Sequence, residues 1–517
     1  MVLDPSLSRR HLLAGLAAPV VPAVPFLPGV PALRPAVLRD PFALGVASGD
    51  PWPTSVVLWT RLAPEPLADD GLGAMPRRPV VVQWQVAEDE AFRTGLRGGY
   101  AVAEPAWAHS VHVEVAGLRP DRPYFYRFRA EGHLSPVGRT RTAPAGGSLP
   151  ASATVGVVSC ANWEEGFFTA YRHLAAEEPD LVLHLGDYLY ESPEDPGTDA
   201  TTGAGHVRGH LGRETRTLAA YRQRHAQYKT DPDLQAAHAA APWAVVPDDH
   251  EVDANWAGAT PQTPQPHFLR RRAAAFRAYY EHMPLRRSSL PRGATMPVFR
   301  RLAWGDLATV HLLDTRQYRY DQACGDTRVI GCTARLAPDR TMLGGAQERW
   351  LGDGLRASPA RRDLLAQQVF VAPKDSFPGP LEEFAMDAWD GYPAARRRLL
   401  RSLTDVRNPV VLTGDVHRHY ANDLLLDATT VAAELVTTSV SSGGDGSVRT
   451  ALTDVQLAEN PHLRWVDSRR GYVVLRLAPD RLRADFRTLP FVRRPGAPVS
   501  TAATFTLADG ERGLRRG

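Results

Sequence analysis

The sequence predicts an α/β protein in two parts: a small all-β domain over residues 40–145, followed by a layered α/β domain over residues 151–490. In the first part, short runs rich in β-branched and aromatic residues are bounded by Pro, Gly and Asp. In the second part, near-continuous apolar runs alternate with helix-like segments, which is typical of strands buried on both faces of a sheet. A linker rich in Pro and Gly at residues 143–150 separates the two patterns.

The first part contains several candidate strands. Residues 55–61 and 79–86 are β-rich, residues 111–115 alternate strictly between apolar and polar side chains, and residues 118–128 form a turn followed by an aromatic strand. Short strands at this spacing predict an immunoglobulin-like or fibronectin-like sandwich.

The second part alternates candidate strands with candidate helices. Helices are expected at residues 167–176, 216–228 and 268–283. Strands are expected at residues 154–158, 181–185, 243–246, 307–313, 368–371, 409–412 and 435–438. Residues 491–517 are expected to form a C-terminal extension outside this domain.

Composition excludes some classes of function. The chain has 517 residues, 44% of them hydrophobic, and a formal net charge of +3. It has no basic tract interleaved with aromatic residues, so it carries no nucleic-acid-binding signature. Beyond the N-terminus it has no unbroken apolar run of about eighteen residues, so no membrane span is expected.

The N-terminus has the features of a twin-arginine signal peptide, expected over residues 1–35. Arg9 and Arg10 precede a modest apolar stretch that ends in small residues near Ala32. The alternative is a disordered tail with a chance arginine pair. A signal of this type predicts the twin-arginine (Tat) export machinery as a partner and a secreted or periplasmic location.

Three cysteines raise the question of pairing. Cys324 and Cys332 are close in sequence, with Gly325 and Gly331 between them, so a tight disulfide loop is plausible. That pairing would leave Cys160 free.

Polar clusters directly follow several of the predicted strands. In open α/β sheets, ligands and catalytic groups gather outside the carboxyl ends of the strands, so clusters that are distant in sequence can converge on one pocket. The clusters contain Cys160, Asn162, Asp187, Tyr190, Asp249, His250, Asp415, His417 and His419.

The residue types in these clusters suit a pair of metal ions. A carboxylate such as Asp187 has two oxygens and can bridge two ions. Thiolate, phenolate and imidazole ligands favour a Lewis-acidic transition metal, whereas a group of carboxylates favours a hard cation such as Ca²⁺ or Mg²⁺. Taken singly, each residue also has an ordinary structural interpretation, such as a buried cysteine or a core tyrosine. Their shared position at strand ends favours a metal site.

The same clusters resemble a known family. Gly186-Asp187-x-x-Tyr190 is similar to a block of the purple-acid-phosphatase-like metallophosphoesterases, and Asp249-His250-Glu251 and Gly414-Asp415-Val416-His417 stand where further blocks occur. Cys160 and Asp415 replace residues usual in that group, which is the pattern of the PhoD-type alkaline phosphatase / phospholipase D family. Further blocks follow in the family's order, so the resemblance covers nearly the whole chain after residue 40.

The resemblance implies a set of roles. Cys160, Asp187, Tyr190 and His417 would hold Fe³⁺, and Asp187, Asp249 and Asp415 would serve one or two Ca²⁺ ions. A metal-bound hydroxide would attack the phosphorus of a phosphate-ester substrate, and His250 would stabilise the transition state or protonate the leaving oxygen.

Other residues have weaker predicted roles. Asn162, Asn255 and His419 are candidates for supporting or substrate contacts. Lys374 either meets the substrate phosphate or is a surface lysine; it follows the strand at residues 368–371, where the family usually carries a histidine, so the ligand set of the second metal stays open.

Three functions are compatible with these residues. The leading prediction is a secreted metal-dependent hydrolase of phosphomonoesters, phosphodiesters or both. The runner-up is a phospholipase-D-like phosphodiesterase that acts on phospholipids. The third is a binding protein with a structural metal site, against which His250 and an open coordination position argue, because structural sites are closed.

Overall fold

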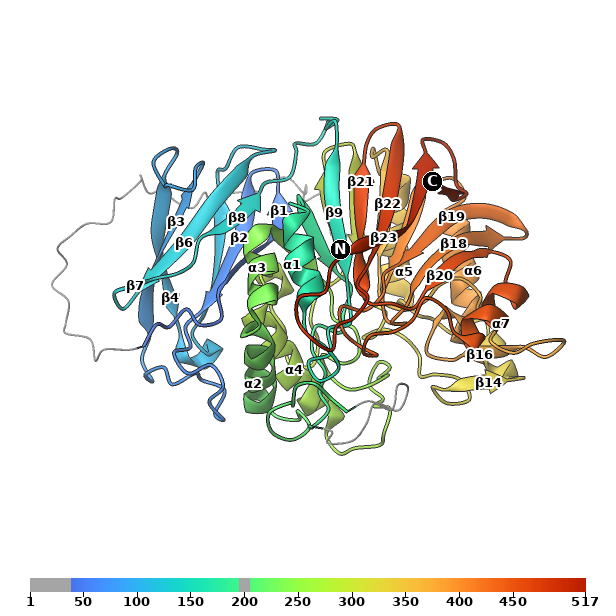
Figure 1. Cartoon of the computed structure of the whole chain (residues 1–517), viewed down its shortest axis with the longest axis horizontal. Coiled ribbons are helices and arrows are strands. Elements are labelled where there is room, and N and C mark those ends of the chain that lie inside the picture. Colours follow the sequence, from blue (N-terminus) through green and yellow to red (C-terminus); the bar gives the residue numbers. More distant parts are fainter. Residues whose placement is uncertain (1–38, 195–204) are drawn as a thin grey trace, which may run out of the picture.

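The computed structural model describes residues 39–194 and 205–517 and contains three main β-sheets with helices on the outside (Figure 1). The predicted signal peptide, residues 1–35, lies outside the described residues. In the part of the chain that is described, no helix has both the length and the apolar character needed to cross a membrane.

A ten-stranded sheet runs through the molecule. Its strand order is β24-β23-β22-β21-β9-β10-β11-β1-β2-β5, and β9, β10 and β11 pair in parallel. These three strands end at the site described below. The strands are β1 (Val46–Trp52), β2 (Ser55–Arg61), β5 (Ser110–Ala116), β9 (Ala153–Val158), β10 (Leu181–His184), β11 (Pro242–Val245), β21 (Gly471–Leu477), β22 (Arg481–Thr488), β23 (Ser500–Ala508) and β24 (Arg515–Arg516).

A seven-stranded sheet faces the first. Its order is β12-β13-β15-β17-β19-β18-β20, with β13, β15, β17 and β19 in parallel. The strands are β12 (Arg300–Trp304), β13 (Ala308–Leu312), β15 (Arg362–Ala366), β17 (Pro409–Thr413), β18 (His419–Leu426), β19 (Thr429–Val436) and β20 (Leu463–Asp467). A separate two-stranded ribbon consists of β14 (Arg328–Ile330) and β16 (Glu383–Ala385).

The two large sheets pack face to face. A hydrophobic core of side chains from both sheets, including Val157, Leu183, Val310 and Leu412, fills the space between them. Helices α1 (Thr169–Ala176), α2 (Leu218–Lys229), α3 (Pro232–Ala240) and α4 (Phe268–His282) contribute to the core on the outer face of the first sheet. The predicted layered α/β architecture is therefore confirmed, in the order helices, sheet, sheet, helices.

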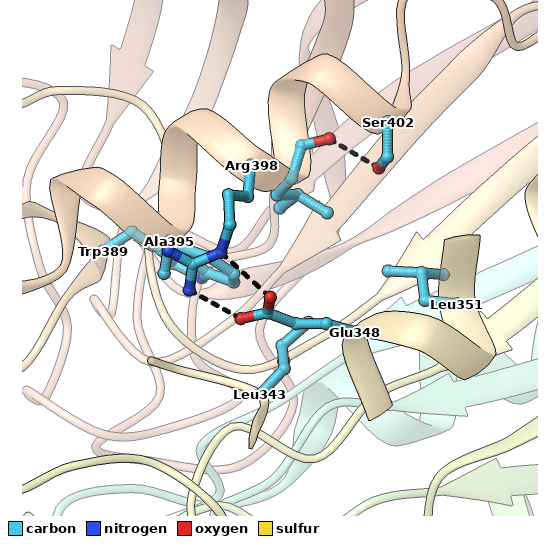
Figure 2. Close-up of a pocket in the computed structure, with 8 residues that line it drawn as sticks. Leu343, Glu348, Leu351, Trp389, Ala395, Arg398 and Ser402 are labelled. Atoms are coloured by element: carbon cyan, nitrogen blue, oxygen red, sulfur yellow. Dashed lines mark hydrogen bonds and ion pairs between the residues drawn. The ribbon is translucent and has the colours of Figure 1, made fainter. Parts of the chain in front are cut away.

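Helices α5 (Gly344–Arg356) and α6 (Pro393–Ser402) cover the outer face of the second sheet. A small pocket of about 100 Å³ lies between them, lined mainly by apolar side chains and spanned by the ion pair of Glu348 with Arg398 (Figure 2). None of the predicted site residues lines it. The remaining helix is α7 (Ala451–Glu459), and short 3-10 turns are η1 (Pro105–Trp107), η2 (Arg287–Ser289), η3 (Thr333–Leu336) and η4 (Trp389–Gly391).

The N-terminal β-sandwich shares a sheet with the rest of the molecule. Strands β1, β2 and β5 pack against a sheet made of β3 (Val80–Ala87), β4 (Arg97–Ala103), β6 (Pro123–Ala130), β7 (His133–Leu134) and β8 (Gly138–Arg141). β1 also pairs in parallel with β11, through Ser48 opposite Pro242 and Gly49 opposite Trp243. The predicted boundary near residue 145 therefore crosses a continuous hydrogen-bonded sheet.

Two sequence-based expectations require correction. Residues 368–371 form no strand; the strand at this point of the sheet is β15, which ends at Ala366, and Gln368 instead bonds neighbouring loops through its side-chain amide. Residues 491–517, expected outside the domain, add β23 and β24 to the ten-stranded sheet, where Phe505 and Leu507 join the core. Alternation of apolar and polar residues from 503 to 507 was the available signal.

The cysteines pair as the sequence suggested. Cys324 and Cys332 form a disulfide with an S–S distance of 2.13 Å, and Cys160 is free and buried.

A buried basic cluster joins the N-terminal strands to the helices. Arg61 on β2 lies 2.7 Å from His282 on α4, and the ring of His282 stacks on that of His225 with 4.8 Å between centroids. Lys229 Nζ lies 3.3 Å from His238 Nε2 and 4.4 Å from the centroid of Trp59. Burial lowers the pKa of Lys229 to about 7 and the pKa values of these histidines well below their usual value.

This cluster makes a contribution to stability that rises with pH. Below about pH 6.5 the unfolded chain takes up protons on histidines that stay neutral when folded, and between about pH 7 and pH 10.5 the same holds for Lys229. Each such proton contributes about 1.4 kcal/mol per pH unit. The free energy of unfolding of the wild type minus that of Lys229→Met, measured by urea denaturation from pH 5 to pH 10, should stay level below pH 7 and rise by about 1.4 kcal/mol per pH unit above it, because the other titrating groups are common to both proteins. An unchanged slope in the variant would contradict the assignment.

Candidate metal centre

Segments distant in sequence bring their polar side chains together at the ends of the parallel strands. Cys160 follows β9, Asp187 follows β10, Asp249 follows β11, and Asp415 and His417 lie between β17 and β18. The two large sheets touch here, because Ser159 forms a parallel bridge with Ser439. The site therefore lies where the carboxyl ends of strands from both sheets meet.

Three groups of side chains have ligand atoms close enough to share an ion. In each group, one atom from every residue lies within 4.8 Å of the others. The groups are Cys160 with Asp187 and His417; Asp187 with Asp249 and His250; and Asp248 with Asp249 and Asp415. Asp187 and Asp249 each belong to two groups, so the groups form one continuous cluster.

The first group also includes Tyr190. Its hydroxyl lies 3.1 Å from Asp187 Oδ2 and 3.0 Å from His417 Nε2. Ser442 Oγ donates a hydrogen bond of 2.8 Å to the same hydroxyl. A sulfur, a phenol, an imidazole and a carboxylate thus surround one point, and this donor set favours a transition metal.

The backbone around the cluster is unusual. Cys160, Asp187, Asp415 and His417 all have positive φ, at 58°, 54°, 64° and 54°. Residues with a side chain rarely adopt this left-handed conformation, at a cost of about 1–2 kcal/mol each. Its occurrence at four candidate ligands indicates that packing holds these side chains in place against a local backbone preference.

Glu251 holds the loops after β10 and β11 in register. Its buried carboxylate accepts hydrogen bonds from the backbone N–H groups of Asp187 (3.2 Å), Tyr188 (2.6 Å) and Asp248 (2.7 Å). Gly186 allows this approach, since a Cβ there would lie 2.3 Å from Asp248 Cβ. Both residues of the Gly186-Asp187 sequence therefore have a structural reason: Gly186 permits the close contact with Asp248, and Asp187 supplies a candidate metal ligand.

Charge and hydrogen bonding show that the cluster fits cations. Burial, reinforced by the nearby Asp187 carboxylate, raises the pKa of Cys160 and Tyr190 well above their usual values. Burial and then the Asp249 charge raise the pKa of Asp187 in the same direction. Asp187 Oδ1 and Asp248 Oδ2 are buried without a hydrogen-bond donor. Anionic donors with unused buried oxygens are stabilised by bound cations.

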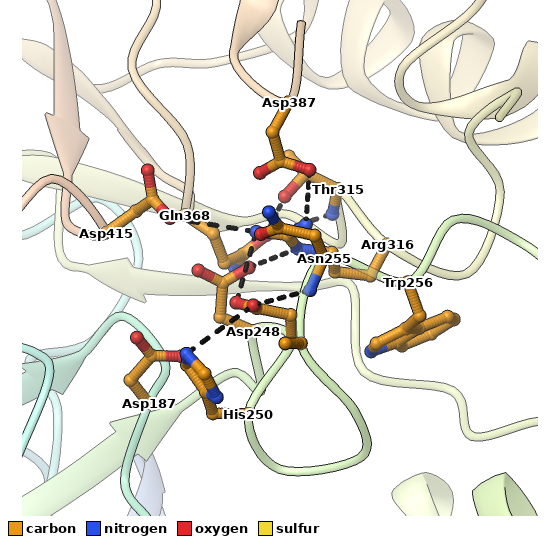
Figure 3. A network of polar contacts seen from close by, with 12 residues as sticks. Asp187, Asp248, His250, Asn255, Trp256, Thr315, Arg316, Gln368, Asp387 and Asp415 are labelled. Carbon is orange, nitrogen blue, oxygen red and sulfur yellow. Dashed lines mark hydrogen bonds and ion pairs between the residues drawn. The ribbon is translucent and has the colours of Figure 1, made fainter. Parts of the chain in front are cut away.

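Arg316 contributes a fixed positive charge that the sequence did not reveal as part of the site. Its guanidinium, 1% exposed, lies 2.5 Å from Asp248 Oδ1, 3.1 Å from Asp249 Oδ1 and 2.9 Å from Asp387 Oδ1 (Figure 3). Asp415 Oδ1 is 3.7 Å away. The available signal was the short sequence Asp314-Thr315-Arg316 after a strand. Nothing in that sequence indicates which distant carboxylates the arginine contacts.

His250 lies at the accessible side of the cluster. Its Nδ1 is 2.7 Å from Glu191 Oε2 and its Nε2 is 3.8 Å from Asp249 Oδ2, and a quarter of its side chain is exposed. Burial disfavours the charged ring, but the carboxylates of Glu191, Asp249 and Asp187 outweigh burial and raise the pKa of His250 well above its usual value. The ring can therefore act as a proton donor at neutral pH.

The weaker candidates occupy different environments. Asn255 lies at the cluster: its N–H donates to Asp249 Oδ2 at 2.8 Å, and its side chain donates to Asp326. The Asn162 side chain accepts a hydrogen bond from the N–H of Glu164.

His419 and Lys374 differ in how their polar atoms are used. His419 is buried: its Nδ1 accepts a hydrogen bond from the backbone N–H of Thr438 at 3.1 Å, and its Nε2 lies 3.1 Å from Arg487 O. Both ring nitrogens are thus engaged by backbone. Lys374 is 7% exposed, so it is not a surface lysine.

Comparisons with known proteins agree with this geometry. Residues 155–486 match the family model described as PhoD-like phosphatase, and residues 30–144 match the model of its N-terminal domain. Alkaline phosphatase D of Bacillus subtilis (strain 168) is 48% identical over 485 residues, covering 92% of this chain and 82% of that protein.

Solved structures extend the comparison. The structure of PhoD matches with a TM-score of 0.90 and 47% identity over 93% of each chain. A purple acid phosphatase, PPD1 from yellow lupin (Lupinus luteus) seeds, matches with a TM-score of 0.51 and 11% identity, over 90% of this chain and 74% of that one. At this identity the second likeness concerns the fold alone.

Arg316→Met tests whether the guanidinium balances the carboxylates. Breaking a buried ion pair by removing one partner typically costs about 3–5 kcal/mol. We expect a loss of that order in the free energy of unfolding in the presence of a chelator, and a smaller loss in millimolar Ca²⁺, because a cation can take over the lost charge. Arg349→Met, at an exposed residue of α5, is the control. An equal loss with and without Ca²⁺ would limit Arg316 to a packing role.

Proposed function

This chain belongs to the PhoD-like phosphatase family and is a phosphoric ester hydrolase, and we propose that it hydrolyses phosphomonoesters, phosphodiesters or both at the cluster of strand-end side chains. The observation that supports the location most strongly is the approach of Cys160, Asp187 and His417 to within 4.8 Å of one another, next to two carboxylate groups.

We assign the donors by their chemistry. Cys160, Asp187, Tyr190 and His417 would hold Fe³⁺, because thiolate, phenolate and imidazole suit a transition metal. Asp187, Asp249 and Asp415 would serve one or two Ca²⁺ ions, which prefer oxygen ligands. When bound, the ions would polarise the phosphoryl group and supply the nucleophile.

The other side chains would act on the substrate and on the protons. Glu191, at 2.7 Å from Nδ1, fixes the ring of His250 so that Nε2 is directed toward Asp249 and the cluster. His250 would then donate a proton from Nε2 to the leaving oxygen, or a hydrogen bond to the transition state. Asn255 would orient Asp249 through its backbone N–H and remains a candidate for substrate contact.

His419 is assigned a supporting role. Because both of its ring nitrogens face backbone groups, it would fix the start of β18 and thereby the position of His417. Asn162 would similarly shape the loop after Cys160, because its backbone N–H donates a hydrogen bond to Ser442 Oγ at 3.2 Å.

A phospholipase-D-like activity on phospholipids is the second candidate, since it requires the same phosphoester chemistry. We also propose that the twin-arginine motif at Arg9 and Arg10 directs export to a secreted or periplasmic location. Twin-arginine export carries folded proteins, which would let the metal centre assemble before the chain leaves the cell.

Asp187→Asn tests the bridging carboxylate. The amide keeps the volume but removes the negative charge, so activity should fall by more than the roughly 100-fold typical of a residue that only supports a ligand. Circular dichroism should show the fold retained, and metal analysis should show reduced content. Activity within tenfold of the wild type would remove Asp187 from the proposed site.

Tyr190→Phe tests the ferric assignment by colour. Purified wild-type protein should contain iron and absorb visible light through the phenolate, and the variant should lose that band. Tyr188→Phe is the matched control, because its buried hydroxyl bonds to His238 and not to the cluster. A wild-type enzyme that is fully active, colourless and free of iron would contradict the assignment.

A substrate panel separates the two candidate functions. We expect a phosphomonoester or a soluble phosphodiester to be hydrolysed with a kcat/KM at least about tenfold above that for a phospholipid dispersed in detergent, a difference of about 1.4 kcal/mol in transition-state stabilisation. The reverse order would favour the phospholipase-D-like activity.

A further inference from the structure

A group of positively charged side chains lies next to the metal centre without a carboxylate partner. It consists of Arg328 on β14, Lys374, and Arg418 beside His417. Within residues 39–194 and 205–517, no ion pair joins any of these three to an acidic side chain. Lys374 is buried, Arg418 is half-buried and Arg328 is exposed. Arg316, by contrast, pairs with the carboxylates of Asp248 and Asp387. We call these three residues the basic wall.

Contacts around Tyr420 hold the basic wall together. Lys374 Nζ lies 4.1 Å from the ring centroid of Phe370 and 5.3 Å from that of Tyr420. The Phe370 and Tyr420 rings pack edge to face, with 5.0 Å between centroids. The Arg418 side chain hydrogen-bonds Tyr420, and the charge of Arg328 also acts on that residue. Two loops and a strand thus converge on one buried tyrosine.

The basic wall borders the proposed ligands. Arg418 directly follows His417, and the N–H of Gly414 donates to Gln368 O at 2.9 Å, which ties the Asp415 loop to the segment that leads to Lys374. Lys374 and Asp415 are near enough for each charge to act on the other. The basic wall therefore lies on the Asp415 side of the cluster.

Nearby acids do not neutralise it. Asp390 accepts from the backbone N–H of Lys374 at 3.0 Å and pairs through its other oxygen with Arg396 at 2.5 Å. Asp415 lies 3.7 Å from Arg316 and is a proposed cation ligand. Lys374 is 7% exposed, and a contact with an aromatic face recovers only part of the hydration that a buried ammonium loses. A bound anion would supply the partner that Lys374 lacks.

We propose that Lys374, Arg418 and Arg328 form an anion subsite that binds a second phosphate group of the substrate, a few bonds from the phosphoryl group that reacts. This rests on the proposed function. The substrates favoured are then phosphate esters with a further phosphate nearby, either small molecules with two phosphates or chains of phosphodiester units. Guanidinium and ammonium groups recognise phosphate by charge-assisted hydrogen bonds.

A matched pair of substrates tests the subsite. 1,3-Propanediol bisphosphate and 1,3-propanediol monophosphate differ only in the second phosphate. The bisphosphate has two equivalent ends, so its kcat/KM is first divided by two. We expect this corrected kcat/KM of the wild type to exceed that of the monophosphate by at least about tenfold, which is the gain that one charge-assisted hydrogen bond would give. Most of the preference should appear in KM, because the contact is made before and during reaction.

Variants of the basic wall should lose this preference. In Lys374→Met and in Arg418→Met, the corrected ratio of the two kcat/KM values should fall toward about one, while Lys374→Arg should retain most of it. Arg349→Met, which removes an exposed arginine elsewhere, should leave the ratio unchanged. Iron content and thermal melting of each variant show whether the centre and the fold are intact, and the ratio itself is insensitive to a uniform loss of active enzyme.

A second pair of substrates distinguishes the source of the second phosphate. Bis(3-hydroxypropyl) phosphate is compared with the same diester carrying one terminal phosphate. A preference in this pair alone points to chains of diester units, and a preference in the first pair alone points to small bisphosphates; either supports the subsite.

Two outcomes would overturn the proposal. Equal corrected kcat/KM values within both pairs in the wild type, or ratios that persist in Lys374→Met and Arg418→Met, would remove the subsite and leave the proposed function standing. Metal-loaded wild-type protein that hydrolyses no member of either pair would reject both.

Discussion

The structure depends on the accommodation of negative charge at the strand ends. Asp187, Asp248, Asp249 and Asp415 crowd one small volume together with a buried thiol and a buried phenol. Carboxylates this close repel each other, and burial weakens the screening that water would supply. Arg316 supplies one positive charge from within the chain, and His250 supplies another beside Glu191. Bound cations would supply the rest, and folding of this region would then be coupled to metal binding.

Hydrogen bonds and core packing hold the loops that carry this charge in place. Glu251 collects three backbone N–H groups from two loops, and four candidate ligands have left-handed backbone conformations. These features cost free energy locally and are supported by two sheets and the core between them. A site built at the ends of buried strands can hold its ligands more exactly than one built on free loops.

Much of this arrangement could be predicted from the sequence, because the strongest signals were local. Apolar strands followed by Cys160, Asp187 and Asp249 predicted both the sheet and the residues that converge at its edge. The predictions failed where the decisive contacts are long-range. Arg316 is separated by more than sixty residues from the acids it holds, as the hydrogen bonds to Asp248 and Asp387 show. Strand β23 and the pairing of β1 with β11 are likewise defined by neighbours far away in the chain.

The pairing of β1 with β11 has a consequence for biosynthesis. β1 leaves the ribosome almost two hundred residues before β11, yet its Ser48 and Gly49 end up opposite Pro242 and Trp243. The early sandwich can hold β1 in place meanwhile through its own core, offering a ready edge on which the later strands assemble. A chain cut between these regions would leave β11 with an uncovered border of unpaired N–H and C=O groups, a template for self-association.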